Sequence, residues 1–292
     1  MTTLGSPPQD MRPMSESAFN AISVLAKEEA GLILPPGKAT MVQSRLRTRL
    51  RDLGLSDLDA YSEFVCSGEG VAERRFMISA LTTNVSHFFR EAHHFEILRT
   101  KALPPLIERA RAGGRVRIWS AGCSSGQEPY SIAMEMLALA PDLSQRDVLI
   151  LGSDIDPKIL TTAQEATYTA QQVSAVPKDM QRDFLIKKKN SDAMVVAPQV
   201  RKLVRFRELN LLREWPMRGQ FDIIFCRNVV IYFDLATQSS LWPRFRNALS
   251  DDGWFFLGHS ERVTDTSLPL YQSVGLTAYR AADGKSASAP TR

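Results

Sequence analysis

The sequence predicts an α/β protein with a mainly parallel sheet, preceded by a small all-helical domain. Two observations lead to this prediction. Apolar residues recur at helical spacing before about residue 90, and short apolar runs alternate with helical stretches after Pro105. The chain has 292 residues, of which 44% are hydrophobic. It is therefore long enough to bury a large core and to form two domains.

The helical domain is expected over residues 15–90. Leu46 and Leu50 follow helical spacing, while Gly31 and Gly54 interrupt the apolar pattern. Glycine at such interruptions is typical of helix ends, because it tolerates the left-handed backbone conformation found there. The pattern predicts several short helices that pack on one another.

The second domain is expected over residues 91–282. Its strands are predicted in the segments VRIWSAG, VLILGSDID, LVRFRELNL, FDIIFCRNVVIYF and GWFFLGHS. Residues 168–200 are too long for an ordinary crossover connection, and they contain LIKKKNSDAMVV, a segment typical of a hairpin. We expect a small inserted β-subdomain there.

The two ends of the chain, residues 1–14 and 283–292, are rich in Pro, Ser, Gly and Thr, and we expect disordered tails. No apolar run approaches the roughly 18 residues that span a bilayer, and the start lacks the pattern of a signal peptide. A cytoplasmic protein without membrane insertion is expected. Cys66, Cys123 and Cys226 are far apart and odd in number, which predicts reduced thiols and no structural metal.

The overall charge of the chain excludes few classes of function. Lys plus Arg exceed Asp plus Glu by 36 to 32, and a net charge of +4 is too mild to indicate nucleic-acid binding. Between residues 38 and 51, however, five positive charges occur with no negative one, from Lys38, Arg45, Arg47, Arg49 and Arg51. They form either a solvated helix face or a surface for an acidic partner. Nothing indicates an obligate oligomer, so a monomer is expected.

The first strand of the α/β domain is followed by a glycine turn, Gly122-Cys-Ser-Ser-Gly126, and then by a helix. Glycines at this place let a ligand approach the backbone beside the positive end of the helix. Glu128, in the first turn of that helix, is placed to receive a cationic group such as an ammonium. The alternatives are glycines that serve the turn alone and an acidic residue that stabilises the helix terminus.

Polar residues follow three further strands. Asp154 ends the second strand, where doubly wound folds bind ribose hydroxyls, and Asp156 before a proline is a candidate helix cap. Asn210 and Leu211 end the third strand, and Arg227 and Asn228 end the fourth. Since the carboxyl ends of parallel strands meet at one edge, these residues predict a single binding site.

Five segments together resemble one family: LTTNVSHFFREAHHFEIL, IWSAGCSSGQEPYSIA, GSDIDPKIL, FCRNVVIYFD and GHSE. They are similar to the bacterial chemotaxis receptor glutamate O-methyltransferases, the CheR family, over residues 16 to 281. The resemblance implies a Rossmann-like S-adenosylmethionine-dependent methyltransferase domain with a small inserted β-subdomain, preceded by an all-helical N-terminal domain. It implies methyl transfer to receptor glutamates, with S-adenosylhomocysteine as the product and without a metal.

The resemblance also implies a set of cofactor-binding residues in addition to Gly122: Asn84, Ser86, Arg90, Glu128, Asp154, Asn210, Leu211, Arg227 and Asn228. Ser86 departs from the Thr that is usual in the family motif, but it keeps the hydroxyl group.

The implied substrate is a glutamate carboxylate, which is ionised at neutral pH because its ordinary pKa is about 4.3. No general base is therefore needed, and the site mainly aligns and desolvates the two reactants. Arg90 and Tyr232 are the candidates for guiding the carboxylate. The alternatives are a surface ion pair for Arg90 and a core position for Tyr232. His87, His93 and His94 are expected on a helix in structural roles, and His259 has no assigned role.

Receptor recognition is expected through the methylation helices, which are acidic and would meet Arg45, Arg47, Arg49 and Arg51. Some members of the family also bind a receptor's C-terminal peptide through a glycine-rich loop of the β-subdomain. The corresponding segment here, KKKNSDAMVV, lacks glycine, so peptide tethering is not expected.

Two other functions compete with this interpretation. A nucleic-acid methyltransferase agrees with a pI near 9.0, but the fourth-strand segment lacks the Pro-Pro motif expected of amino-group methylation. A signalling module that binds the cofactor without catalysing transfer is the second alternative, and the intact pocket residues disfavour it.

Overall fold

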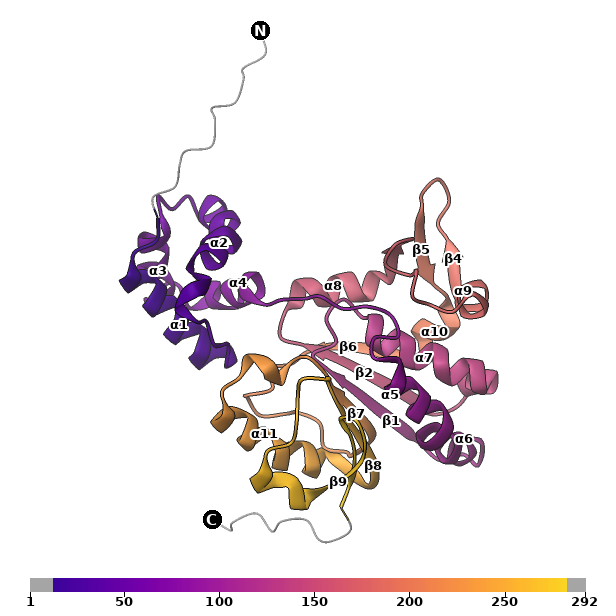
Figure 1. The fold of residues 1–292 in the computed structure, drawn as a ribbon. Helices are drawn as coiled ribbons and strands as arrows, with labels where there is room; N and C mark the ends of the chain where they lie inside the picture. The colour runs from indigo at the N-terminus through magenta and orange to yellow at the C-terminus, as the bar shows by residue number, and fades with distance from the viewer. Residues whose placement is uncertain (1–12, 283–292) are drawn as a thin grey trace. The chain divides into compact units, whose positions relative to one another are not determined.

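The computed structural model describes residues 13–282 (Figure 1), and the chain divides into two compact units, Met1–Thr83 and Asn84–Arg292. The expected tails lie outside the described residues, apart from positions 13 and 14. No helix in the described part is both long and apolar enough to cross a membrane. The three cysteines are free thiols, as predicted.

The division falls earlier than the boundary expected at residue 90. Segment 84–90 belongs to the second unit because its side chains pack against residues of that unit and its backbone forms a hydrogen bond to it. The Phe88 and Tyr168 rings pack edge to face with their centroids 4.9 Å apart, and the Phe89 N–H donates to Ser131 Oγ at 3.0 Å.

The first unit is all-helical, as predicted. Its helices are α1 (Glu16–Ala30), α2 (Ala39–Leu53), α3 (Leu58–Cys66) and α4 (Val71–Leu81), with a 3₁₀ turn at Pro36–Lys38. The Ser15 hydroxyl caps α1 by accepting from the Ala18 N–H, and Gly31 ends it with φ 67°. Leu46 and Leu50 of α2 are buried, so their helical spacing marks the core-facing side.

The second unit contains a seven-stranded sheet in the order β6-β2-β1-β7-β8-β10-β9. The strands are β1 (Val116–Ala121), β2 (Val148–Asp154), β6 (Val204–Glu208), β7 (Phe221–Cys226), β8 (Leu249–Leu257), β9 (Tyr271–Gly275) and β10 (Ala278–Ala281). β6, β2, β1, β7 and β8 are parallel, and β10 and β9 add antiparallel pairs. This confirms the predicted fold class.

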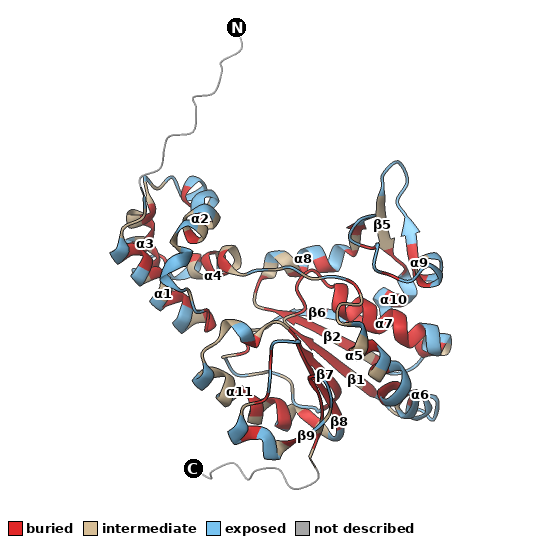
Figure 2. Ribbon diagram, viewed as in Figure 1, coloured by how far each residue is buried: buried red, intermediate tan, exposed pale blue. Residues whose placement is uncertain are grey.

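Helices cover both faces of this sheet (Figure 1). They are α5 (Ala92–Ile97), α6 (Leu103–Arg111), α7 (Gln127–Leu139), α8 (Pro157–Glu165) and α11 (Leu235–Ala248), with a π-helical turn at Leu98–Ala102 and 3₁₀ turns at Pro141–Gln145, Val230–Tyr232 and Asp265–Leu270. Successive residues of β1 point to opposite faces of the sheet and pack in two hydrophobic cores. Ile118 packs with α6 and α7, and Trp119 packs with α11. The central strands β1, β2 and β7 are buried along most of their length (Figure 2).

The insertion between β2 and β6 forms the expected β-subdomain. Its elements are β3 (Thr167–Thr169), α9 (Lys178–Phe184), β4 (Leu185–Lys187), β5 (Ala193–Val196) and α10 (Pro198–Lys202). The three strands are antiparallel in the order β3-β5-β4, and Ile186 lies opposite Val195 in the predicted hairpin. The hairpin tip projects from the body of its unit (Figure 1).

Candidate active site

The glycine turn after β1 has two positions at which no side chain fits. Gly122 has φ 77°, and a Cβ built on it would lie 2.3 Å from Cγ2 of Val229. Gly126 has φ 90°, and its added Cβ would meet Tyr168 Oη at 3.1 Å. Both positions therefore require glycine, for backbone conformation and for space. The Gly122 N–H donates to Ser153 O at 2.7 Å, which fixes the turn to the end of β2.

Asp154 holds the same turn from the second strand. Its Oδ2 accepts the Ser124 N–H at 2.9 Å, and its Oδ1 accepts the Asp156 N–H at 3.0 Å. Burial raises the pKa of this carboxyl group. Asp156 caps α8 through the Lys158 N–H, as expected, and it also accepts a hydrogen bond from Asn84 Nδ2 at 2.8 Å. Asn84 is thereby placed beside the glycine turn.

Glu128 and Arg227 form a buried ion pair that the sequence did not indicate. Arg227 Nε lies 2.7 Å from Glu128 Oε2, and the Ser120 hydroxyl donates to Glu128 Oε1 at 2.7 Å. Arg227 Nη1 also donates to the Arg90 carbonyl at 2.6 Å. Two residues expected to bind the cofactor separately are thus bound to each other.

Glu91 extends this network and was missed by sequence reasoning. Its Oε2 lies 3.5 Å from Arg227 Nη1, and its Oε1 lies 3.2 Å from His259 Nδ1. Burial acts to raise the pKa of Glu91, but the charge of Arg227 and the hydrogen bonds from His259 leave it lowered. In the sequence, its position directly after the candidate residue Arg90 is the feature that could have indicated a role in the site.

His94 occupies a structural position, as the sequence suggested. It is fully buried, and Nε2 lies 3.1 Å from both Thr277 Oγ1 and Leu276 O. Burial lowers its pKa to about 4, so the ring is neutral at neutral pH. His93 also lies on α5, but His87 does not, because residues 83–87 have no helical structure. The expectation of a helix at His87 was wrong.

Glu91, His93 and His94 also offer three possible metal-ligand atoms within 4.8 Å of one another. The Arg227 guanidinium lies 3.5 Å from the Glu91 carboxylate and 3.3 Å from His94 Nδ1. A second cation would be repelled there, so the cluster favours the arginine over a metal ion.

The third strand contributes Asn210 and Leu211. The Leu209 N–H donates to the Asp154 carbonyl at 2.9 Å, which places this turn beside the end of β2, and Asn210 Oδ1 accepts the Leu212 N–H at 2.9 Å. Leu211 packs into the core between the sheet and α11. A contribution of Leu211 to ligand binding would therefore come from its backbone.

The fourth strand leads into a loop that carries Asn228 and Tyr232. Asn228 has φ 60°, a left-handed conformation that asparagine tolerates better than most residues. Tyr232 is half-buried, and its hydroxyl makes no hydrogen bond within residues 13–282. Val229, between them, packs against Gly122. The loop therefore closes one side of the glycine turn.

Arg90 and Ser86 lie in the segment that precedes α5. Arg90 is half-buried, and its Nη1 donates to the Val85 carbonyl at 3.2 Å. In the described part of the chain it forms no ion pair with a carboxylate. The structure gives Ser86 no hydrogen bond to the residues around the glycine turn, so its predicted role remains an expectation.

The fold and this cluster define the class of the second unit. A glycine turn follows β1, an acidic residue ends β2, and polar residues follow β6 and β7 at the same edge of a mainly parallel sheet. This is the arrangement of a Rossmann-like domain that binds an adenosine-containing cofactor.

Comparison with known families identifies the chain further. Residues 84–279 match the family described as CheR methyltransferase, SAM binding domain, and residues 17–82 match CheR methyltransferase, all-alpha domain. The chain belongs to the CheR family and is an S-adenosylmethionine-dependent methyltransferase.

Curated relatives agree over most of the chain. A "Probable chemotaxis protein methyltransferase" of Rhizobium etli is 47% identical over 254 residues, which cover 86% of this chain and 95% of the relative. A "Chemotaxis protein methyltransferase" of Escherichia coli is 39% identical over 257 residues, 86% of each chain. A "Chemotaxis protein methyltransferase 2" of Pseudomonas aeruginosa is 39% identical over 85% of this chain and 87% of its own.

The arginines of α2 differ in how far they are available to a partner. Arg49 donates two hydrogen bonds to the Glu73 carboxylate, of 2.8 and 2.7 Å. Arg45 Nη1 donates to the carbonyls of Leu81 and Thr82. Both therefore hold α2 to α4. Arg47 and Arg51 are exposed, as is Lys38.

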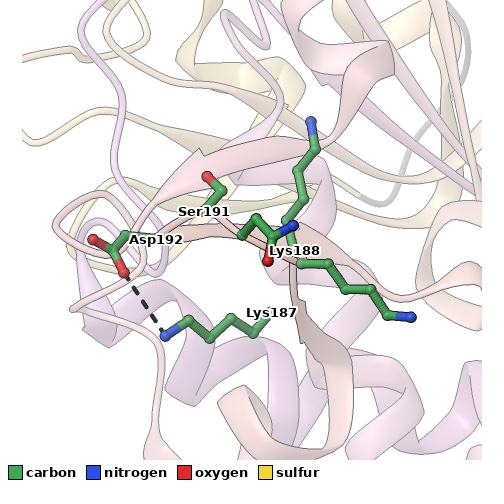
Figure 3. Close-up of a pocket in the computed structure, with 6 residues that line it drawn as sticks. Lys187, Lys188, Ser191 and Asp192 are labelled. Atoms are coloured by element: carbon green, nitrogen blue, oxygen red, sulfur yellow. Dashed lines mark ion pairs between the residues drawn. The ribbon is translucent and has the colours of Figure 1, made fainter.

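The tip of the β-subdomain hairpin is basic. Residues Lys187, Lys188, Lys189, Asn190, Ser191 and Asp192 line a shallow pocket of about 540 Å³ (Figure 3). Asn190 takes φ 58°, the conformation for which glycine is usually selected, and Lys187 Nζ lies 3.7 Å from the Asp192 carboxylate. The turn thus forms without the glycine whose absence was noted in the sequence.

Proposed function

We propose that this methyltransferase transfers the methyl group of S-adenosylmethionine to glutamate side-chain carboxylates of chemotaxis receptors, giving glutamate methyl esters and S-adenosylhomocysteine. The proposal takes its support from the family, from relatives named as chemotaxis protein methyltransferases, and from the charges around the glycine turn. The protein would act in the cytoplasm on the cytoplasmic helices of those receptors.

The donor set fits the cofactor. Asp154 suits ribose hydroxyls, Glu128 suits the ammonium group, and the glycines at 122 and 126 leave room for close approach to the backbone. Asn84, Ser86, Asn210, Leu211, Arg227 and Asn228 complete the proposed cofactor-binding set. When bound, S-adenosylmethionine supplies an electrophilic methyl group on a sulfonium sulfur.

One observation favours an anionic substrate. The site holds two arginines, and Arg227 is neutralised by Glu128 and Glu91. Arg90 has no carboxylate partner within residues 13–282, so its charge is available to a carboxylate from the cofactor or the substrate. A glutamate side chain matches that charge, whereas a neutral amine or a base edge does not.

The remaining chemistry requires alignment more than proton transfer. A glutamate carboxylate is already ionised at neutral pH, since its ordinary pKa is about 4.3. We infer that Arg90 and the Tyr232 hydroxyl orient this carboxylate toward the methyl group. The attacking oxygen forms the new C–O bond while the sulfur keeps the electron pair of the broken C–S bond, so no proton moves.

Receptor recognition would use the exposed cations of α2. Of the four arginines predicted for this role, Arg47 and Arg51 are exposed, whereas Arg45 and Arg49 are engaged within their own domain. The acidic methylation helices of a receptor are the complementary partner. We propose direct recognition of these helices without a C-terminal peptide tether.

The test is incubation with methyl-labelled S-adenosylmethionine and membranes that contain chemotaxis receptors, followed by alkali. Label released as methanol would establish glutamyl esters. Alkali-stable label would contradict the proposal and favour amine or nucleic-acid methylation. Tight cofactor binding without any label on a panel of receptors would favour a non-catalytic module.

A further inference from the structure

Glu261 lies outside every set of residues assigned so far, yet it contacts the loop that carries Asn228 and Tyr232. Its Oε2 accepts the N–H groups of Asn228 and Gly258, at 2.8 and 2.6 Å. Its Oε1 accepts the N–H groups of Val229 and Ile231, at 2.8 and 3.2 Å. One carboxylate therefore binds four backbone donors from two loops.

This carboxylate is buried without a cation. Glu261 is 3% exposed, and in the described part of the chain no Lys, Arg or His side chain forms an ion pair with it. Burying a charge in this way is unfavourable unless its hydrogen bonds are satisfied. The four N–H groups supply that compensation, so the charge and the loop conformation depend on each other.

The conformation that Glu261 holds is an uncommon one. Asn228 has φ 60°, and its N–H is one of the four donors. A Cβ on Gly258 would lie 2.6 Å from Asn228 Nδ2 and 2.8 Å from Glu261 Oε2, so glycine is needed for this close approach. A strained backbone persists when its surroundings fix it from several sides.

The loop lies at the proposed active site. Val229, whose N–H Glu261 accepts, packs against Gly122 of the glycine turn. The same loop starts at Arg227, which pairs with Glu128, and it ends at Tyr232. A shift in this loop would therefore move residues proposed for the cofactor and for the substrate together.

We propose that Glu261 is a positioning residue for methyl transfer: its carboxylate fixes the 227–232 loop so that Asn228 and Tyr232 meet the cofactor and the substrate. This inference rests on the proposed function and adds to it a residue that touches neither reactant. Only an ionised carboxylate provides acceptors on both oxygens. In Glu261→Gln one oxygen becomes an NH₂ group that faces two N–H donors.

Asp222 provides a control on β7, the strand that leads into the 227–232 loop. It is buried at the amino end of β7, accepts the Arg117 N–H at 2.7 Å and pairs with Arg109. Asp222→Asn also removes a buried charge that binds backbone, but it does so at the edge of the sheet away from the glycine turn. Loss of stability alone would affect both variants alike.

The experiment measures S-adenosylmethionine affinity by calorimetry, kcat and KM for receptor methylation, Tm, and amide hydrogen exchange at residues 228, 229 and 231. For Glu261→Gln we expect faster exchange at these amides, at least tenfold weaker cofactor binding, and a fall of about 100-fold in kcat/KM at a Tm close to that of Asp222→Asn. Asp222→Asn should keep wild-type affinity and kcat.

Wild-type cofactor affinity and turnover in Glu261→Gln would overturn the inference, as would equal losses in Asp222→Asn. If Glu261→Gln does not fold, Glu261→Asp is judged by the same criteria, because it keeps the charge but is too short to bridge both loops. Failure of the wild type to methylate receptors would contradict the proposed function instead. The exchange and affinity measurements would still decide whether Glu261 fixes the loop.

Discussion

Arg227 Nε lies 2.7 Å from Glu128 Oε2, and the two side chains are buried at the carboxyl edge of the sheet. The pair joins the end of β7 to the first turn of α7. Each residue is therefore part of the domain's stability as well as of the proposed cofactor site, and removing either leaves the other charge buried without its main partner.

The first prediction concerns this pair. Arg227→Met and Glu128→Gln should each lower the free energy of unfolding by about 3 kcal/mol, because each removes the main partner of a buried charge. The double variant should lose clearly less than the sum of the two. Urea unfolding of the four proteins gives the coupling energy, and strictly additive losses would contradict the expected interdependence.

The sequence predicted the elements of the site better than their connections. The glycine turn and the polar strand ends were predicted because glycine spacing and strand periodicity are local signals. The contact between Arg227 and the Arg90 carbonyl spans 137 residues, so no local pattern announces it. Glu261 was quoted within a motif, but its four backbone bonds depend on two loops that only the folded sheet brings together.

The error at His87 has a local cause. Apolar residues such as Phe88 precede α5 in the sequence, and their spacing continues the helical pattern of that segment. In the structure Phe89 and Glu91 take φ values of 52° and 59°, which interrupt the helix before Ala92. Neither residue type marks a left-handed backbone in the way that glycine does.

A second prediction concerns the close contact of the glycine turn. Gly122→Ala should weaken cofactor binding at least tenfold and destabilise the fold, because the new Cβ meets Val229 Cγ2 at 2.3 Å and φ is 77°. Adding Val229→Ala should relieve the contact but not the backbone strain. Partial recovery of affinity in the double variant, measured by calorimetry, is the expected result, and no recovery at all would contradict the contact.

His94 predicts a pH dependence of stability. Its pKa falls from an ordinary 6.5 to about 4 through burial, so the unfolded chain binds a proton more readily than the folded one. The stabilisation is complete above about pH 6.5 and is lost as the pH falls toward about 4. From about pH 7 to about pH 5 we expect a loss of about 2 kcal/mol in the free energy of unfolding. His94→Gln should flatten this dependence, and an unchanged slope would contradict the assignment.

The α2 arginines should separate into two classes. Arg49→Ala should cost about 3 kcal/mol of stability, because it leaves Glu73, which is 5% exposed, without its cation. Arg47→Glu combined with Arg51→Glu should change stability by less than about 0.5 kcal/mol and yet slow receptor methylation, most strongly at low salt. Unchanged methylation at low salt in this double variant would exclude the exposed arginines from receptor recognition.

The last prediction distinguishes the positive charge of Arg90 from the planar arrangement of its hydrogen-bond donors. Arg90→Gln removes the one site cation without a carboxylate partner in the described chain, and we expect kcat/KM for the receptor to fall about 100-fold. Arg90→Lys keeps the charge but loses the planar pair of donors, so it should recover only part of the loss. If the loss appears in KM for S-adenosylmethionine with kcat unchanged, Arg90 binds the cofactor carboxylate. If it appears in kcat at saturating cofactor, the arginine orients the glutamate in the transition state, because an interaction that strengthens only there raises kcat.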